Sequence, residues 1–191
     1  KILVVKDLKS KAIFAHVVPQ KGVDEDKYVV QLVTNDVEWM GHTKLLVKSD
    51  NEPSLGALVR QSLEAIRCQV HKVDAVSKEH SMEYDSQSNG GTEVGVKAIR
   101  GLLRTHKMCL ERRIGKKIPA CHPLMTWLLE HVSFLLNVCN KGEDGRTPWC
   151  RVRGRGFGRR LYSFAEAVMW KPPLKGPRHD KSYCIGHRQL T

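Results

Sequence analysis

Strand-like and helical patterns follow one another in a definite order along this chain, and that order limits the folds it can adopt. Residues 2–5 and 12–18 are runs of β-branched and apolar side chains, separated by the polar stretch 6–11. Two such runs joined by a short polar segment predict a β-hairpin. Longer patterns with helical spacing follow the hairpin and alternate with shorter strand-like runs. The chain is therefore predicted to have an α/β fold.

The elements after the hairpin are predicted from apolar spacing and from capping residues. Asp24 and its acidic neighbours precede a helical pattern, and Pro53 begins a second one. A polar stretch rich in helix breakers predicts a loop. The expected order is a helix ending near Gly41, a strand at 44–48, a helix from Pro53 through Ile66, a strand at 70–76, a loop at 78–91, and helices at 92–113 and 122–140.

Charge divides the chain into two unequal halves. The formal net charge of the 191 residues is +12. Residues 1–93 carry 12 basic and 14 acidic side chains, whereas residues 94–191 carry 20 basic and 6 acidic ones. Such an asymmetry favours a polyanionic partner. Because the sequence has no amphipathic anchor and no lipidation motif, nucleic acid is favoured over a membrane face.

The composition is that of a folded intracellular protein. Apolar residues make up 41% and charged residues 27% of the chain, which excludes collagen-like and wholly disordered classes. The longest apolar stretch, 126–139, is broken by Glu130 and His131 and is too short to span a bilayer. No apolar signal segment follows the amino terminus, and the six cysteines form no Cys-x-x-Cys pair. We expect reduced thiols, no membrane partner, no secretion, and a nuclear location when the protein acts on DNA.

Two short motifs carry residues suited to phosphate chemistry. Asp50 and Asn51 follow the strand predicted at 44–48, and the run 87–93 (Gln-Ser-Asn-Gly-Gly-Thr-Glu) leads into a basic helix. Carboxylates are the ligands that hard Mg²⁺ prefers, and phosphodiester transfer uses two such cations to clamp the attacking and leaving oxygens. Each motif also has a simpler interpretation, because an Asp-Asn pair is typical of a turn or helix cap and Glu93 suits a helix amino terminus.

In order and in context, the two motifs resemble the catalytic core of retroviral and retrotransposon integrases. Residues 46–51 match the hydrophobic-hydrophobic-x-Ser/Thr-Asp-Asn pattern that carries a catalytic Asp, and residues 87–93 match the loop before the catalytic Glu. The resemblance implies a ribonuclease H-like fold, a mixed sheet flanked by helices, over residues 1–140. It also implies that Asp50 and Glu93 are catalytic and hold Mg²⁺ or Mn²⁺, and that a DNA donor end and a target duplex are partners of a homo-oligomer.

The integrase family has a third catalytic carboxylate, for which no match is found in this sequence. If residues 2–5 and 12–18 are the second and third strands, the first strand and its Asp lie upstream of Lys1. Asp7 falls in the turn between the two strands and is not assigned a metal. With two of three ligands, the metal site is expected to be weak and catalysis weak or absent.

A row of basic residues follows Glu93. Lys97, Arg100 and Arg104 come four, seven and eleven residues later, which places them on the same side of a helix. Contacts from this row to phosphates would position DNA without reading its sequence. An ordinary solvated face is the alternative. The further residues that the resemblance assigns to DNA binding are Asn51, Gln87, Ser88 and Asn89.

Residues 141–191 are predicted to form a basic linker and a small β-containing tail. The step Arg146-Thr147-Pro148 followed by a strand resembles the segment downstream of the core in retrotransposon polyproteins, and residues 165–170 are expected to form an isolated strand. Residues 151–160 alternate Arg with Gly around one Phe, which fits either a flexible solvated tail or a nucleic-acid clamp.

The activity implied by the resemblance is DNA integration, in which a DNA 3′ end is trimmed and its 3′ hydroxyl then attacks a target phosphodiester. Two alternatives stay open. The first is a non-catalytic nucleic-acid-binding remnant of a retrotransposon polyprotein, which uses the same basic surface without turnover. The second is a ribonuclease-type hydrolase, which cleaves an RNA strand in a hybrid and joins nothing.

Overall fold

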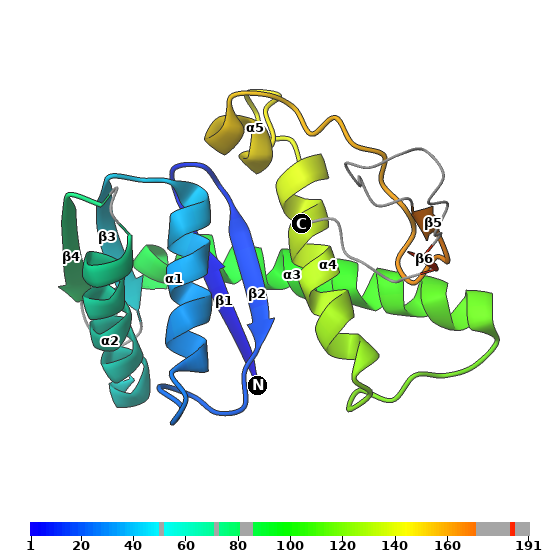
Figure 1. The fold of residues 1–191 in the computed structure, drawn as a ribbon, viewed down its shortest axis with the longest axis horizontal. Coiled ribbons are helices and arrows are strands. Elements are labelled where there is room, and N and C mark those ends of the chain that lie inside the picture. Colours follow the sequence, from blue (N-terminus) through cyan, green and yellow to red (C-terminus); the bar gives the residue numbers. More distant parts are fainter. Residues whose placement is uncertain (50–51, 71–72, 81–85, 171–183, 186–191) are drawn as a thin grey trace, which may run out of the picture.

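The structure, a computed structural model, describes residues 1–49, 52–70, 73–80, 86–170 and 184–185 (Figure 1). The strands are β1 (Ile2–Lys6), β2 (Ile13–Val17), β3 (Lys44–Ser49), β4 (Ala75–His80), β5 (Met169–Trp170) and β6 (Cys184–Ile185). The helices are α1 (Tyr28–Met40), α2 (Pro53–Gln69), α3 (Ser86–Ile114), α4 (Leu124–Cys139) and α5 (Pro148–Arg153). The predicted α/β class is confirmed. Within the described ranges, no helix has the length and apolar character needed to cross a membrane.

The strands pair in twos. β1 and β2 form the predicted antiparallel hairpin, with Ile2 opposite Val17. β3 and β4 run parallel, with Lys44 opposite Ala75, and α2 connects them. Parallel and antiparallel strands are therefore both present, as expected of a mixed sheet. In the part of the chain that the structure describes, however, the two pairs are separate sheets.

The hairpin lies between two layers of helices because its side chains alternate. Ile13 and Ala15 of β2 pack with residues of α3 and α4, whereas Phe14 stacks edge-on against Trp39 of α1 at 5.3 Å. Figure 1 shows α1 in front of the hairpin and α3 behind it. Successive side chains of a strand point to opposite faces, so helices cover both faces of β2.

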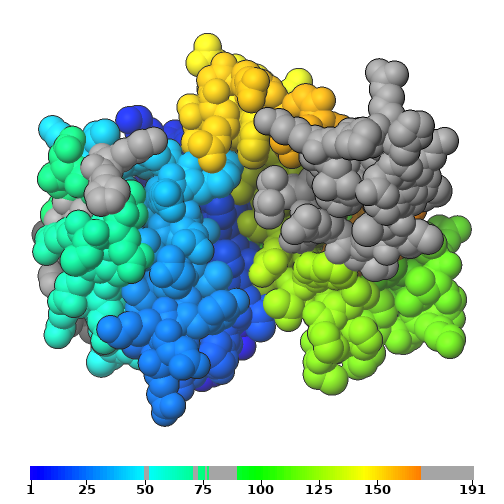
Figure 2. Space-filling view, viewed as in Figure 1, coloured from blue at the N-terminus to red at the C-terminus, as the bar shows by residue number. Residues whose placement is uncertain are grey.

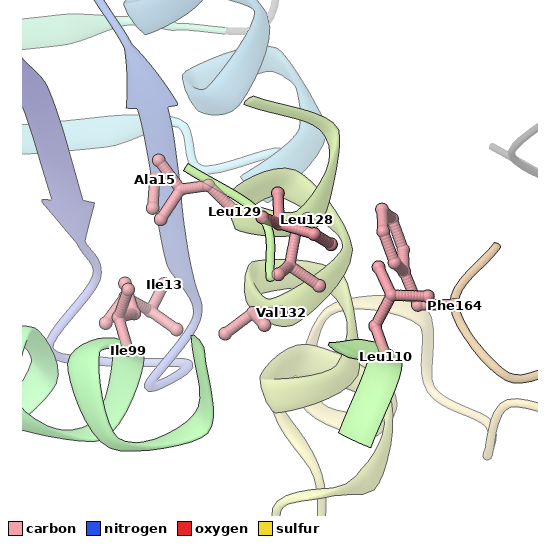
Figure 3. Packing of buried hydrophobic residues seen from close by; sticks show 9 residues of the cluster. Ile13, Ala15, Ile99, Leu110, Leu128, Leu129, Val132 and Phe164 are labelled. Carbon is pink, nitrogen blue, oxygen red and sulfur yellow. The ribbon is translucent and has the colours of Figure 1, made fainter. Parts of the chain in front are cut away.

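The largest hydrophobic cluster joins the hairpin, α3, α4 and a residue far beyond α4. Figure 3 shows Ile13 of β2 beside Ile99 of α3, and Phe164 beside Leu110 of α3. Phe164 is buried, although it lies in the segment predicted to be a tail. The buried members of the cluster are Ile13, Ala15, Ile99, Leu110, Ile118, Leu128, Leu129, Val132 and Phe164.

Side chains of α4 cover the outer edge of β2. The Oδ1 of Asn137 accepts a hydrogen bond from the N–H of Ile13, and its Nδ2 donates to the carbonyl of the same residue, each at 2.9 Å. The hydroxyl of Ser133 donates to that carbonyl as well, also at 2.9 Å. Covering an edge in this way prevents it from pairing with another chain.

Two element boundaries in the middle of the chain differ from the prediction. The strand expected at 70–76 lies instead at β4, because the N–H groups of Asp74 and Ala75 donate to the carbonyl of Thr43 and set the register of the parallel pair. Val70 is instead the cap of α2, and its N–H donates to the carbonyl of Ile66. The loop predicted at 78–91 is correspondingly shorter, because β4 ends at His80 and α3 begins at Ser86.

The segment after α4 also differs from the prediction. Residues 148–153, which the sequence pattern assigns to the linker, form the short helix α5. The Thr147 side chain caps this helix by accepting from the N–H of Cys150 at 3.2 Å, and a proline in the first turn suits a helix start. Of the isolated strand expected at 165–170, only residues 169–170 form a strand, β5, and it is not isolated, since it pairs with β6.

Candidate functional site

The first half of α3 lies directly on the hairpin because two of its residues have no side chain. A Cβ built on Gly95 would come within 2.7 Å of the Cδ1 of Ile13, and one on Gly91 within 3.1 Å of the Cδ2 of Leu8. The Nζ of Lys6 on β1 donates a hydrogen bond to the carbonyl of Gly91. Glycine at these two positions therefore allows the helix to approach closely, and Lys6 ties its second turn to the sheet.

Glu93 lies on the opposite side of α3 from this contact. With 3.6 residues per turn, positions 91 and 95 share one face of the helix and position 93 points away from it. Glu93 is accordingly exposed. Lys97, Arg100 and Arg104 follow on the same face, and all three are exposed. The structure therefore brings together these four predicted site residues, while their chemical roles stay predictions.

Glu111 lies about two helical turns after Arg104, the last residue of the basic row. This buried carboxylate accepts hydrogen bonds from the Nζ of Lys107 and the N–H of Ile118, both at 2.8 Å. The hydrogen bond from Lys107, followed by the one from Ile118, lowers the pKa of Glu111 to about 2. Lys107 thus serves a structural ion pair. By contrast, no described acidic residue forms an ion pair with the row of Lys97, Arg100 and Arg104.

The remaining predicted site residues fall near the ends of β3 and α3. Asp50 and Asn51 come directly after Ser49, the last residue of β3, and lie outside the described residues. The loop expected to carry the second motif is instead helical, because α3 begins at Ser86. The motif residues in these first helical turns are Gln87, Ser88 and Asn89.

The predicted metal ligands, Asp50 and Glu93, are carboxylates. Carboxylate oxygens are the ligands that Mg²⁺ prefers. In the described part of the chain, however, no group of three or more His, Cys, Asp or Glu side chains is placed to hold a metal ion. A cation held beside α3 would draw on Glu93 and would require Asp50 as a second ligand.

Asp7 has a structural role that accounts for its oxygens. It accepts hydrogen bonds from the backbone N–H groups of Lys9 and Ser10 at 3.1 and 2.8 Å, and from the Ser10 hydroxyl. The Nε2 of His42 lies 2.7 Å from the same carboxylate. Burial alone would raise the pKa of Asp7, but the hydrogen bonds from Ser10 and His42 outweigh it and lower the pKa. Asp7 therefore closes the hairpin turn through these hydrogen bonds.

Comparison with known proteins gives matches to solved structures alone. No protein-family model and no curated protein matches this sequence. The catalytic core domain of BIV integrase is similar to this chain with a TM-score of 0.53 and 20% identity, over 80% of this chain and 85% of that one. The fold is that of a retroviral integrase catalytic core.

A second match extends this likeness along the chain. It is to a simian T-cell lymphotropic virus intasome in complex with a PP2A regulatory subunit, with a TM-score of 0.57 and 15% identity. The match covers 93% of this chain and 54% of the other. Coverage of 93% necessarily extends past residue 140, so the likeness to integrase structures includes part of the segment predicted as a linker and tail.

Sequence reasoning missed the residues that place α3 in this integrase-core fold. Lys6 had no visible partner in the sequence, because Gly91 lies 85 positions further on. The sequence does indicate this contact through Gly91 and Gly95, which are four residues apart and therefore lie on one face of a helix. In the sequence, Gly91 was interpreted as part of a loop, and this spacing was therefore not used.

Proposed function

We propose that this chain is an integrase-type, DNA-binding core for phosphodiester transfer. The observation that carries the proposal is the exposed face of α3, where Glu93 stands in line with three cations. The integrase-core fold supports it, since one similar structure is a catalytic core domain and the other belongs to an intasome. In this proposal, a DNA donor end and a target duplex are the partners, the protein acts in the nucleus, and it assembles with further copies of itself.

The binding step is assigned to Lys97, Arg100 and Arg104. Their side chains extend from one helical face into solvent, so a phosphodiester backbone can lie along them without any rearrangement of the core. Such contacts fix the position of DNA and do not read its sequence. Glu93, on the same face, then stands beside the bound backbone.

The transfer step is assigned to Asp50 and Glu93 as ligands of Mg²⁺ or Mn²⁺. When bound, such a cation stabilises the charge that develops on the attacking and leaving oxygens of the phosphodiester. The two carboxylates hold the cation next to the backbone that the basic row positions. With two carboxylates in place of three, we expect strand transfer by these 191 residues to be weak or absent.

A non-catalytic nucleic-acid-binding protein is the second candidate, and one observation favours it. Lys97, Arg100 and Arg104 are exposed on one face of α3, and no described acidic residue forms an ion pair with them. Binding through Lys97, Arg100 and Arg104 requires no metal. A chain that retains this face can therefore bind DNA even where transfer has been lost.

The test separates binding from transfer in the 191-residue chain. Duplex DNA binding is measured by fluorescence anisotropy over a range of salt, and joining of a labelled 3′ end is measured with Mg²⁺ or Mn²⁺. Replacing Lys97, Arg100 and Arg104 with Gln should reduce the slope of log affinity against log salt by about 2.7, since each phosphate contact contributes about 0.9. Duplex binding that is unchanged in this triple variant would contradict the proposal.

The metal ligands are tested by Asp50→Asn and Glu93→Gln. Each change should abolish any metal-dependent joining and leave DNA affinity nearly unchanged. Glu64→Gln, at an exposed position of α2, is the matched control and should alter neither activity. DNA binding without any joining in the parent chain would select the non-catalytic candidate.

A further inference from the structure

A second basic surface lies outside α3. We name residues 151–164 the basic strap; it starts in α5 and continues as the Arg-Gly run to Phe164. Figure 1 shows it leaving α5 and crossing above α4, and Figure 2 shows yellow and orange atoms along the upper edge of the molecule. Residues 151–164 contain five arginines and no acidic residue, so this surface is more strongly basic than the chain as a whole.

The amino-terminal end of the strap is fixed to the core. Arg151 donates from Nη1 to the carbonyl of Ser10 at 3.0 Å, and its Nη2 forms an ion pair with Asp144 at 2.6 Å. The guanidinium of Arg153 lies 5.0 Å from the ring centre of Trp39 and 5.8 Å from that of Trp149. Two of the strap's arginines therefore serve as anchors.

The middle and the far end of the strap are fixed by aromatic side chains. Phe157 packs edge-on against Phe134 at 5.4 Å and against Trp149 at 5.1 Å. Phe164 is buried in the main core cluster, and a guanidinium nitrogen of Arg113 donates to its carbonyl. The Arg-Gly run is thus held at three points, and the expectation of a flexible solvated tail does not apply to it.

Three arginines between these anchors are directed to solvent. Arg155, Arg159 and Arg160 are exposed, and among the residues described none is an acidic partner of theirs. The guanidinium of Arg160 lies 5.4 Å from the ring centre of Tyr162. Tyr162 keeps 40% of its surface exposed. The strap therefore presents three cations and one accessible aromatic ring on an anchored backbone.

From this arrangement we infer that the basic strap is a second nucleic-acid site, which binds the backbone and bases of a single strand. Arginines that follow a phosphate backbone, together with an aromatic ring on which a base can stack, are the two parts of such sites. An anchored backbone reduces the conformational entropy lost on binding. The ligand is a single-stranded polynucleotide, and DNA and RNA are its two possible sources.

The strap and the basic row of α3 share no residue. The strap begins against Trp39 of α1, on the other face of the hairpin from α3 (Figure 1), and its far end meets α3 beyond Arg104, at Leu110 and Arg113. The inference requires neither a metal nor strand transfer. It therefore goes beyond the function proposed above and does not depend on it.

The test uses the 191-residue chain and fluorescein-labelled oligo(dT), oligo(U) and duplex DNA. Replacing Arg155, Arg159 and Arg160 with Gln should weaken binding of a single strand at least about fivefold and reduce its salt slope by about 2, at about 0.7 per phosphate contact. The control triple Lys9→Gln, Lys44→Gln and Lys116→Gln removes the same charge from exposed positions on other elements and should change the affinity less than twofold. Comparison of oligo(dT) with oligo(U) decides between DNA and RNA.

The aromatic part is tested at Tyr162. Tyr162→Ala should weaken binding of a single strand about fivefold, while Tyr162→Phe should retain it, because base stacking uses the ring and not the hydroxyl. Single-strand affinity equal in the strap triple and the control triple would overturn the inference, and so would an equal loss for single strands and duplex. A loss of single-strand affinity in the strap triple, together with unchanged duplex affinity in the variant with Lys97, Arg100 and Arg104 replaced, would support this site and contradict the function proposed above.

Discussion

The side-chain amide of Asn137 pairs with both backbone polar groups of Ile13, at 2.9 Å for each bond. A helix side chain thereby occupies the place of a neighbouring strand at the outer edge of β2. Because Asn137 and Ile13 are both buried, water cannot replace these bonds when the amide is removed.

Asn137→Leu should therefore lower the free energy of unfolding by about 2 kcal/mol, since the Ile13 N–H is left buried and unpaired. The Ile13 carbonyl keeps its bond from Ser133. Urea unfolding followed by circular dichroism measures the change, with the exposed Asn140→Ala as control. A loss below about 0.5 kcal/mol would show that the amide pairing contributes nothing.

Replacing Gly95 or Gly101 of α3 with Ala should change the stability of the protein in opposite directions. Gly95→Ala gains helix propensity but places a methyl group 2.7 Å from the Cδ1 of buried Ile13, so we expect a net destabilisation of about 1 kcal/mol. Nothing lies within 4 Å of a Cβ at Gly101, so Gly101→Ala should stabilise by up to about 1 kcal/mol. Thermal unfolding of the two variants side by side checks both signs. Equal shifts would contradict the close approach of α3 to the hairpin.

Because Phe164 is buried in the main core cluster, we expect the folding unit to extend beyond α4. Phe164→Ala should lower the free energy of unfolding by about 3 kcal/mol, because it leaves a cavity in the cluster that contains Leu110. Leu161 is 41% exposed, so Leu161→Ala should change stability by less than about 1 kcal/mol. Guanidinium unfolding curves of the two variants test this. A small effect of Phe164→Ala would leave the domain boundary at the predicted residue 140.

The lowered pKa of Glu111 makes the stability of the folded protein depend on pH. Its pKa is lowered from 4.5 to about 2, chiefly by the hydrogen bond from Lys107, so folding favours the ionised form. The resulting stabilisation is present in full above about pH 4.5 and is lost as the pH falls toward 2. Glu111→Gln should accordingly lower the melting temperature at pH 7, and its difference from the parent chain should shrink between these pH values.

The control for this measurement is Glu38→Gln, which alters an exposed carboxylate on α1. It should leave the melting temperature nearly unchanged at every pH. A difference between the parent and Glu111→Gln that stays constant from pH 7 to the acid limit would contradict the assigned pKa.

Local patterns predicted the elements whose burial follows a regular period. The hairpin, α1, β3, α2 and α4 lie where the spacing of apolar residues placed them. β4 was placed too early, since its register is set by contact with Thr43, which lies about thirty residues away and leaves no trace in the local pattern. The start of α3 was placed too late, because Gly90 and Gly91 are poor helix formers by themselves, and the contacts of Gly91 with Leu8 and Lys6 of the hairpin are not visible in the local pattern.

In the candidate site, too, the features set by local spacing could be predicted from the sequence, and those set by distant contacts could not. Helical spacing alone predicted that Glu93, Lys97, Arg100 and Arg104 share a face, because that spacing is a local property. Lys6 and the anchors of the strap were missed, since each acts through a partner distant in sequence. The assignment of Asp50 as a metal ligand stays a prediction for the same reason, because it depends on where the end of β3 lies relative to Glu93.

The packing of Phe164 also bears on how the protein folds during its synthesis. Arg113 donates a hydrogen bond to the carbonyl of Phe164, which lies 51 positions later, and Leu110 packs in the same cluster as the Phe164 ring. At about 5–20 residues per second, the ribosome needs roughly 3–10 s to add that length of chain. During this interval α4 is added as well, and the core that it shares with the hairpin and α3 lacks the ring of Phe164. We expect the nascent chain to present an apolar surface to chaperones at this stage and to bury it when the strap arrives.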